Sequence, residues 1–196
     1  MPKIVADSVV FEAILKTVTA HGYSGSTTKM IAEAADVNEA TLFRKYGSKD
    51  QMVLKAMTHL FTKVDVDTLV QYTGDTRADL MRILNNFFEV EKENGRLFMV
   101  LISALPNYPE LQPIAQFPLT LMMKIGQVLA RYQADGVLRQ EHPFQAALTF
   151  MGPIVIAHRI QEAGVSEAIL NINPSVHIDA YLHGRAIVER DALATN

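Results

Sequence analysis

The stretch that decides the fold is residues 26–49, which read STTKMIAEAADVNEATLFRKYGSK. Its apolar and polar residues follow helical spacing on both sides of the short segment 36–38. The pattern predicts one short helix over 29–35 and a second over 39–46, with Asn38 as the N-cap of the second. Leu42 and Tyr46, four residues apart, then face inward. Two short helices joined by a three-residue turn form a helix-turn-helix, whose second helix can enter the major groove of DNA.

The remaining residues of this stretch suit contact with nucleic acid. Hydroxyls and backbone N–H groups at helix starts bind phosphate oxygens, and Lys and Arg add positive charge. Residues 40–49 contain three basic residues and no acidic one. The candidate DNA-binding residues are Thr28, Lys29, Asn38, Glu39, Thr41, Phe43, Arg44, Lys45 and Lys49. Geometry alone leaves a second interpretation open, because many helical proteins contain such a pair of capped helices without binding DNA.

The same stretch resembles the signature of the TetR-like (tetracycline-repressor-like) transcriptional regulators. The resemblance covers about residues 8–60, and the matching positions are Gly22-Tyr23, Ile31-Ala32, Ala35, Val37, Thr41-Leu42 and Ser48-Lys49. It implies that Thr28 and Lys49 hold phosphates. It also implies that a second group approaches bases or backbone, namely Lys29, Asn38, Glu39, Thr41, Arg44 and Lys45.

Three positions depart from the family pattern. Asp36 stands where the turn usually has glycine, and aspartate adopts a left-handed φ less easily than glycine but more easily than most residues. Phe43 replaces the usual tyrosine and lacks the hydroxyl that would reach a phosphate, so we expect Arg44 to carry more of that contact. The N-terminal arm has a single basic residue, Lys3, which predicts no strong contact with the minor groove.

Charge is distributed unevenly along the 196 residues. The net charge is −3, but residues 1–60 carry seven Lys and Arg against six Asp and Glu. A small DNA-reading module within a larger acidic protein would have this distribution.

The chain has no cysteine, which excludes disulfides, thiolate metal sites and cysteine nucleophiles. No signal peptide is recognisable and no apolar run approaches the length of a membrane helix, so we expect a soluble, cytoplasmic protein.

Helical periodicity continues through the rest of the chain and predicts an all-α fold. An apolar stripe over 9–18 ends at His21-Gly22, and a longer helix begins at Lys49 and runs to about Val64. Further helices are expected at about 76–94, 96–105, 119–135, 143–163 and 175–192. We expect a DNA-binding head over residues 1–48 and a helical ligand-binding and dimerisation domain over 49–196, joined through the helix that begins at Lys49 rather than by a flexible linker.

The larger part is rich in phenylalanine and methionine, which can line a cavity that accepts varied apolar ligands. The candidate ligand-binding residues are Phe61, Phe88, Phe98, Met99, Met122, Met123, Phe150 and His158. The alternative is that these side chains are ordinary core.

Two apolar stripes lie on the last two long helices, which are the usual dimer interface of the resembling family. One stripe comprises Phe144, Ala147, Leu148, Met151, Ile154 and Val155, and the other Ile178, Tyr181, Leu182 and Ile187. A homodimer through helices 143–163 and 175–192 is expected because one short reading head binds weakly and two double the contact. The alternative buries both stripes within one subunit.

The chain contains no phosphate-binding glycine loop, no nucleophile elbow and no convincing pair of carboxylates, so we expect no enzymatic activity, no metal and no cofactor. We therefore expect a ligand-responsive repressor that binds a palindromic operator as a dimer and is released by a mainly apolar small molecule. The alternative is a helical small-molecule-binding protein without specific DNA binding.

Overall fold

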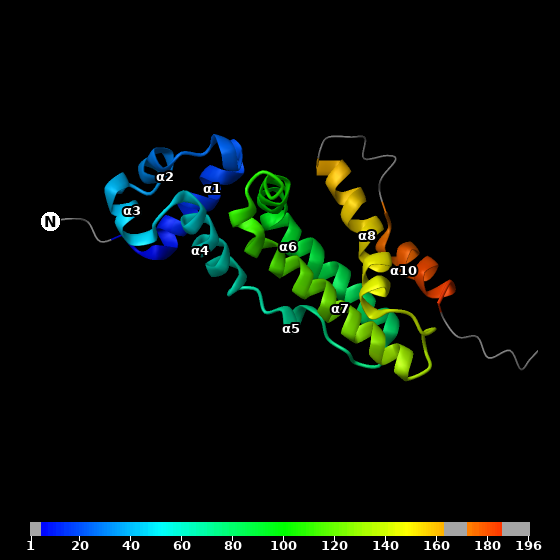
Figure 1. Ribbon diagram of the computed structural model, residues 1–196. Helices are drawn as coiled ribbons and strands as arrows, with labels where there is room; N and C mark the ends of the chain where they lie inside the picture. The colour runs from blue at the N-terminus through cyan, green and yellow to red at the C-terminus, as the bar shows by residue number, and fades with distance from the viewer. Residues whose placement is uncertain (1–4, 163–171, 186–196) are drawn as a thin grey trace, which may run out of the picture. The chain divides into compact units, whose positions relative to one another are not determined.

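The computed structural model describes residues 5–162 and 172–185, and these residues form helices joined by turns and loops (Figure 1). The chain divides into two compact units, each with its own buried core. The first unit comprises Met1–Asp65 and Glu89–Leu119, and the second comprises Val66–Phe88 and Thr120–Asn196. The predicted all-α fold is confirmed.

The first unit contains the four helices at the start of the chain, coloured blue to cyan in Figure 1. They are α1 (Asp7–Gly25), α2 (Thr28–Ala34), α3 (Glu39–Tyr46) and α4 (Lys49–Phe61). The unit also includes the second half of α6 (Thr76–Ala104), the 3₁₀ helix η1 (Pro109–Ala115) and the first residues of α7 (Gln116–Ala134). Its core includes Ile14, Ile31 and Leu42, each at most 1% exposed. These apolar side chains pack together and hold α2 and α3 against α1.

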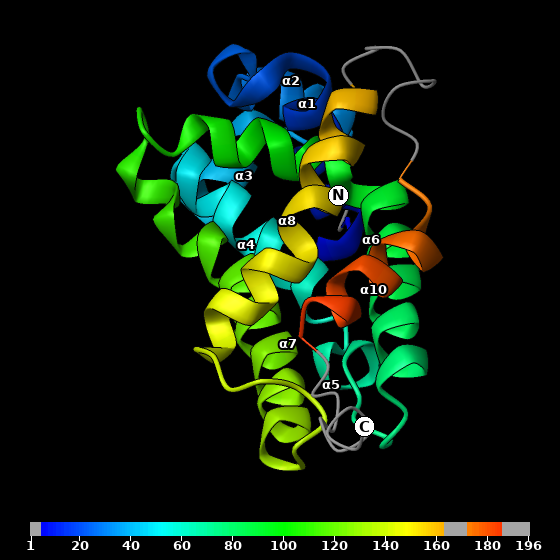
Figure 2. The same cartoon turned by 90° about the vertical axis from the view of Figure 1, so that its right-hand side faces the viewer.

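The second unit contains the short helix α5 (Val66–Leu69), the first half of α6, most of α7, α8 (Pro143–Glu162) and α10 (Pro174–His183). Both views show α10 beside α8 (Figure 2). The Tyr181 hydroxyl donates to the carbonyl oxygen of Ala146 at 3.3 Å, which ties the two helices together. Gly126 lets α7 and α8 approach closely, since a Cβ there would lie 2.8 Å from the carbonyl oxygen of Pro143.

Several predicted helix bounds were correct and one break was wrong. The predicted helix end at Gly22 corresponds to a kink, because Gly22 has a φ of +74°. The chain returns to helical geometry after it and α1 ends at Gly25. The expected break at Asn94-Gly95 does not occur, because α6 continues through it for 29 residues. The Asn94 amide donates to the carbonyl oxygen of Val90 in its own helix, and Gly95 is buried. The expected part of the last helix beyond residue 185 lies outside the described residues.

Candidate nucleic-acid interface

The helix-turn-helix is formed by α2 and α3. Thr27 is the N-cap of α2, since its hydroxyl accepts a hydrogen bond from the Met30 N–H at 3.2 Å. Asn38 is the N-cap of α3, as the sequence predicted, and its side-chain oxygen accepts from the Ala40 N–H at 2.8 Å. Between them Asp36 has φ +53°, the left-handed conformation that the family's glycine adopts easily. Aspartate therefore supports the same turn at this position.

One face of α3 is buried and the opposite face is exposed. Leu42 and Tyr46 are 1% and 4% exposed and belong to the core of the first unit, as predicted. The exposed residues are Asn38, Thr41, Phe43, Arg44 and Lys45. The structure therefore brings most of the predicted α3 contact residues to one accessible surface at the start and outer face of the helix.

The two basic residues of α3 differ in their surroundings. Lys45 forms an ion pair with Asp7 at the start of α1, and Asp7 also accepts a hydrogen bond from the Tyr46 hydroxyl at 2.7 Å. These hydrogen bonds from Lys45 and Tyr46 lower the pKa of Asp7 below its usual value. Arg44 has no ion-pair partner within residues 5–162 and 172–185. Of the two, Arg44 is therefore the cation whose charge no neighbouring carboxylate offsets.

Thr28 and Glu39 contact one another rather than standing apart. The Thr28 hydroxyl donates to a Glu39 carboxylate oxygen at 2.5 Å, which joins the start of α2 to the start of α3. While this bond is present the hydroxyl proton is not available to a phosphate, which needs a donor. The backbone N–H of Thr28, in the first turn of α2, remains suited to that contact.

Lys49 has a structural role that the sequence did not reveal. Its ammonium donates to the carbonyl oxygens of Tyr23 at 2.8 Å and Ser26 at 3.1 Å, and it lies 4.2 Å from the centre of the Tyr23 ring. An ammonium has three N–H donors, so one remains for a phosphate. Lys49 therefore joins the end of α1 to the start of α4, and this link fixes the position of the helix-turn-helix between them.

Two further residues of this surface were missed. Asp7 holds Lys45 and Tyr46, and the Lys55 ammonium donates to the carbonyl oxygen of Tyr46 at 3.2 Å at the end of α3. A cation at that position also interacts favourably with the negative end of the helix dipole. Asp7 lies 38 residues before its partner Lys45, so no local sequence signal identifies it.

The predicted ligand-binding residues are divided between the two units. In the first unit Phe61 and Phe98 form a nearly parallel stack with Phe117, with ring centres 4.2 to 5.8 Å apart, and Met99 is exposed. In the second unit the Phe88 ring lies 6.0 Å from that of His158. The other members of the set in the second unit are Phe150, which is fully buried against Tyr181, Met122, which is partly buried, and Met123, which is exposed. Their role in binding a ligand stays a prediction.

The structure buries part of the two predicted dimer stripes within one subunit. On α8, Ala147, Met151 and Ile154 are at most 2% exposed, and on α10 Ile178 and Tyr181 are at most 4% exposed. These side chains pack in the core of the second unit itself, which is the alternative that the sequence left open. Leu148 of the same α8 stripe is 48% exposed, so only part of each stripe is core, and the homodimer through helices 143–163 and 175–192 stays a prediction. Ile187 lies outside the described residues.

Residues 5–162 and 172–185 hold neither a cluster of metal-ligating side chains nor a helix that could span a membrane. There, His, Asp and Glu side chains do not gather in groups of three that could hold a metal ion. Over the same residues, each helix is too short or too polar to cross a membrane.

Comparison with known proteins gives consistent results. Residues 10–56 match the family model of the bacterial regulatory proteins of the tetR family. The chain is 22% identical over 164 residues to the uncharacterised HTH-type transcriptional regulator YvkB of Bacillus subtilis, covering 83% of this chain and 86% of the relative. Among solved structures, a protein assigned to the TetR-family transcriptional regulators from Mesorhizobium loti has a TM-score of 0.74 at 16% identity, covering 92% of this chain and 96% of that one. The flavonoid-responsive regulator FrrA has a TM-score of 0.67 at 17% identity with the same coverage.

Proposed function

Because this chain belongs to the TetR family of bacterial transcription regulators, we propose that it is a dimeric repressor released from its operator by a mainly apolar small molecule. Each subunit places the first turn and outer face of α3 in the major groove of one half-site. The effector stabilises a conformation in which the two heads no longer match the spacing of the half-sites, and operator affinity falls accordingly.

The observation that carries this proposal is the exposed face of α3. Thr41 and Arg44 are exposed on it, while Leu42 and Tyr46 anchor the helix from behind. An Arg without a competing carboxylate can donate to guanine or to phosphate. The rival function is ligand binding without specific DNA binding. It does not explain why Thr41 and Arg44 are exposed on a helix whose other face is packed in the core through Leu42 and Tyr46.

We assign the dimer contact to the outer faces of α8 and α10. Leu148 and Ile156 lie eight residues apart on α8, with Gly152 midway between them, so the three share one face. Leu148, Ile156 and Val176 of α10 are 48%, 61% and 64% exposed. Exposed aliphatic side chains aligned on helices that are otherwise well packed are suited to an isologous contact with a second copy.

We assign the transmission of the signal to α4. At its first residue, Lys49 is bonded to the carbonyl oxygens of Tyr23 and Ser26, and at its last residue Phe61 stacks against Phe98 and Phe117. A ligand that displaces the Phe61 ring would shift α4 and, through Lys49, the helix-turn-helix. The flavonoid-responsive regulator FrrA, which has a similar fold, supports the choice of a largely apolar ligand.

Binding to labelled duplex DNA, followed by fluorescence anisotropy at several salt concentrations, tests the proposal. Arg44→Ala should weaken binding by about 1–3 kcal/mol if the guanidinium contacts a base, and should lower the salt dependence if it contacts phosphate. Lys92→Ala, at an exposed position of α6 outside the head, is the matched control and should bind like the wild type. Equal affinity of all three proteins would favour the rival function.

A further inference from the structure

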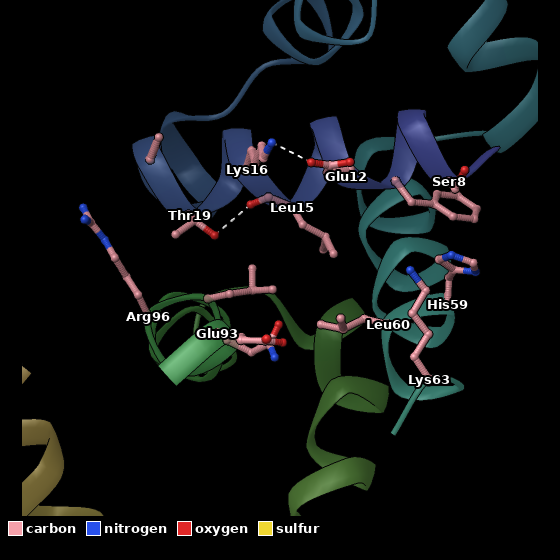
Figure 3. Close-up of a pocket in the computed structure, with 14 residues that line it drawn as sticks. Ser8, Glu12, Leu15, Lys16, Thr19, His59, Leu60, Lys63, Glu93 and Arg96 are labelled. Atoms are coloured by element: carbon pink, nitrogen blue, oxygen red, sulfur yellow. Dashed lines mark hydrogen bonds and ion pairs between the residues drawn. The ribbon is translucent and has the colours of Figure 1, made fainter. Parts of the chain in front are cut away.

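The first unit contains a cavity of about 650 Å³ lined by α1, by the end of α4 and the turn after it, and by α6 (Figure 3). This volume is within the range of sites that bind small molecules. None of the eight candidate ligand-binding residues lines it. This cavity is therefore distinct from the proposed effector site. Binding of a ligand in it does not require the protein to bind DNA.

One part of the cavity wall is apolar. Phe11 and Leu15 come from α1, Leu60 from α4 and Leu97 from α6. Figure 3 shows the Leu15 and Leu60 side chains directed into the space between the helices. A hydrocarbon body placed against these four side chains would be removed from water on several sides, which favours binding in proportion to the area buried.

Among the charged side chains of the cavity, Lys63 is the cation suited to hold an anion. The carboxylate of Glu12 is already paired with the Lys16 ammonium at 2.6 Å, so this pair contributes no net charge. Apart from this pair, Lys63 and Arg96 form no ion pair with the residues that the structure describes, and Glu93 is the remaining carboxylate of the lining. Figure 3 shows the Lys63 ammonium directed toward the cavity and Arg96 turned away from it.

A buried polar atom lies at the same end of the cavity as Lys63. The Nε2 atom of His59 is buried and has no hydrogen-bond partner among the residues that the structure describes. A buried ring nitrogen without a partner is unfavourable, and because this atom has almost no accessible surface, an acceptor oxygen on a ligand reaches it only when the His59 ring turns toward the cavity. Figure 3 shows His59 near the end of α4 and Lys63 in the turn that follows this helix.

From these features we propose that this cavity is a binding site for an amphipathic carboxylate. The hydrocarbon part lies against Phe11, Leu15, Leu60 and Leu97, and the carboxylate accepts hydrogen bonds from Lys63 and, once its ring turns toward the cavity, from His59. An occupant would contact both head helices α1 and α4 as well as α6. Occupancy would therefore stabilise the packing of the head within the first unit, independently of the Phe61 stack.

Titration calorimetry with decanoate, using decanol as the uncharged probe of the same length, tests the proposal. The wild type should bind decanoate more tightly than decanol. Lys63→Met removes the charge but keeps the length of the side chain, and it should weaken decanoate binding about tenfold or more while changing decanol binding little, because a hydrogen bond to a charged group is lost. Lys92→Met, which alters an exposed lysine of α6 outside the cavity, should bind both probes like the wild type.

A second variant locates the site without altering charge. Thr19 lines the cavity from the surface of α1, and its hydroxyl bonds only to the Leu15 carbonyl oxygen of its own helix, so Thr19→Trp should fold and fill part of the space. It should weaken the binding of both probes, and a circular-dichroism melt confirms that it folds. The proposal is overturned if the wild type does not bind decanoate, if decanol binds equally tightly, or if Lys63→Met and Thr19→Trp both bind decanoate like the wild type.

Discussion

At the scale of single residues, Asp36 determines whether the turn between α2 and α3 forms without strain. Its φ of +53° lies in the left-handed region, which aspartate tolerates and β-branched residues do not. Asp36→Val should lower the free energy of unfolding by about 1–2 kcal/mol, whereas Asp36→Gly should cause little loss. Urea denaturation measures both. Glu33→Val, on the exposed surface of α2, is the control for a new valine, and an equal loss at both positions would contradict the turn explanation.

Arg44 and Lys49 are both basic, but replacing Lys49 should lower stability, whereas replacing Arg44 should lower DNA affinity alone. Lys49→Met removes two hydrogen bonds to carbonyl oxygens, so the unfolding free energy should fall by about 1 kcal/mol in the absence of DNA. Arg44→Met should leave stability unchanged and lower DNA affinity alone, since Arg44 has no ion-pair partner among the described residues. Thermal denaturation combined with DNA-binding curves separates the two effects. Unchanged stability of the Lys49 variant would show that its bonds to Tyr23 and Ser26 are unimportant.

At the scale of helices, the sequence predicted the elements whose signals are local. The helices α2 and α3 were located because Thr27, Asn38 and the inward pair Leu42 and Tyr46 lie within or next to them. The helix α6 was split wrongly at Gly95, because the cost of a helical glycine can be offset by close packing that only the tertiary structure shows. The short α5 and η1 were missed, since such elements depend on contacts outside themselves.

In the candidate site, the sequence predicted the exposed face of α3 but not the contacts between helices. Helical periodicity sufficed to place Thr41 and Arg44 on the exposed face of α3. It could not show that Thr28 is bonded to Glu39, that Lys45 is paired with Asp7, or that Lys49 is bonded to Tyr23 and Ser26. Those partners are 11 to 38 residues apart in the chain, so only the packing of the helices brings them together.

The second unit is stabilised by a buried carboxylate that joins α6, α7 and the loop before α6. Asp79 is fully buried, forms an ion pair with Arg82, and accepts hydrogen bonds from the Thr73 N–H at 2.7 Å and from the Tyr132 hydroxyl at 2.5 Å. Burial alone would raise the pKa of Asp79, but the hydrogen bonds from Thr73 and Tyr132, together with Arg82, lower it below its usual value. The carboxylate therefore stabilises the fold only in its ionised form.

Asp79→Asn should lower the free energy of unfolding by about 3 kcal/mol at neutral pH, because it leaves Arg82 and three donors, two on Thr73 and one on Tyr132, without their carboxylate. A group with a lowered pKa contributes its full stabilisation above its unfolded pKa of about 4, and the contribution is lost as pH falls through the folded pKa. The difference between wild type and variant, measured by urea denaturation, should therefore shrink below about pH 4.

The control for this experiment is Asp75→Asn. Asp75 is an exposed residue whose carboxylate accepts from the Ala78 N–H at 2.9 Å at the start of α6. Asparagine caps a helix about as well as aspartate, so this variant should have nearly wild-type stability at all pH values. A difference between the wild type and Asp79→Asn that did not change with pH would show that the ionised carboxylate is not the stabilising form.

At the scale of the whole molecule, dimerisation should depend on the exposed apolar residues of α8. Ile156→Glu should yield a folded monomer at micromolar concentrations, because a charge would be buried at the proposed contact. Sedimentation velocity measures the oligomeric state. Val137→Glu, at a position 43% exposed in the loop after α7, should remain a dimer. A clean dimer for Ile156→Glu would place the interface elsewhere.

Selection from a library of random duplex DNA shows whether a dimer of this protein reads DNA with α3. We expect the wild-type protein to enrich a two-fold symmetric sequence whose half-sites lie about one helical turn apart, because paired helix-turn-helix heads bind successive major grooves. The double variant Thr41→Ala and Arg44→Ala, which changes two exposed residues and no core residue, should enrich no such sequence. Recovery of the same sequence by the double variant, or of no symmetric sequence by the wild type, would show that a dimer does not read DNA with α3.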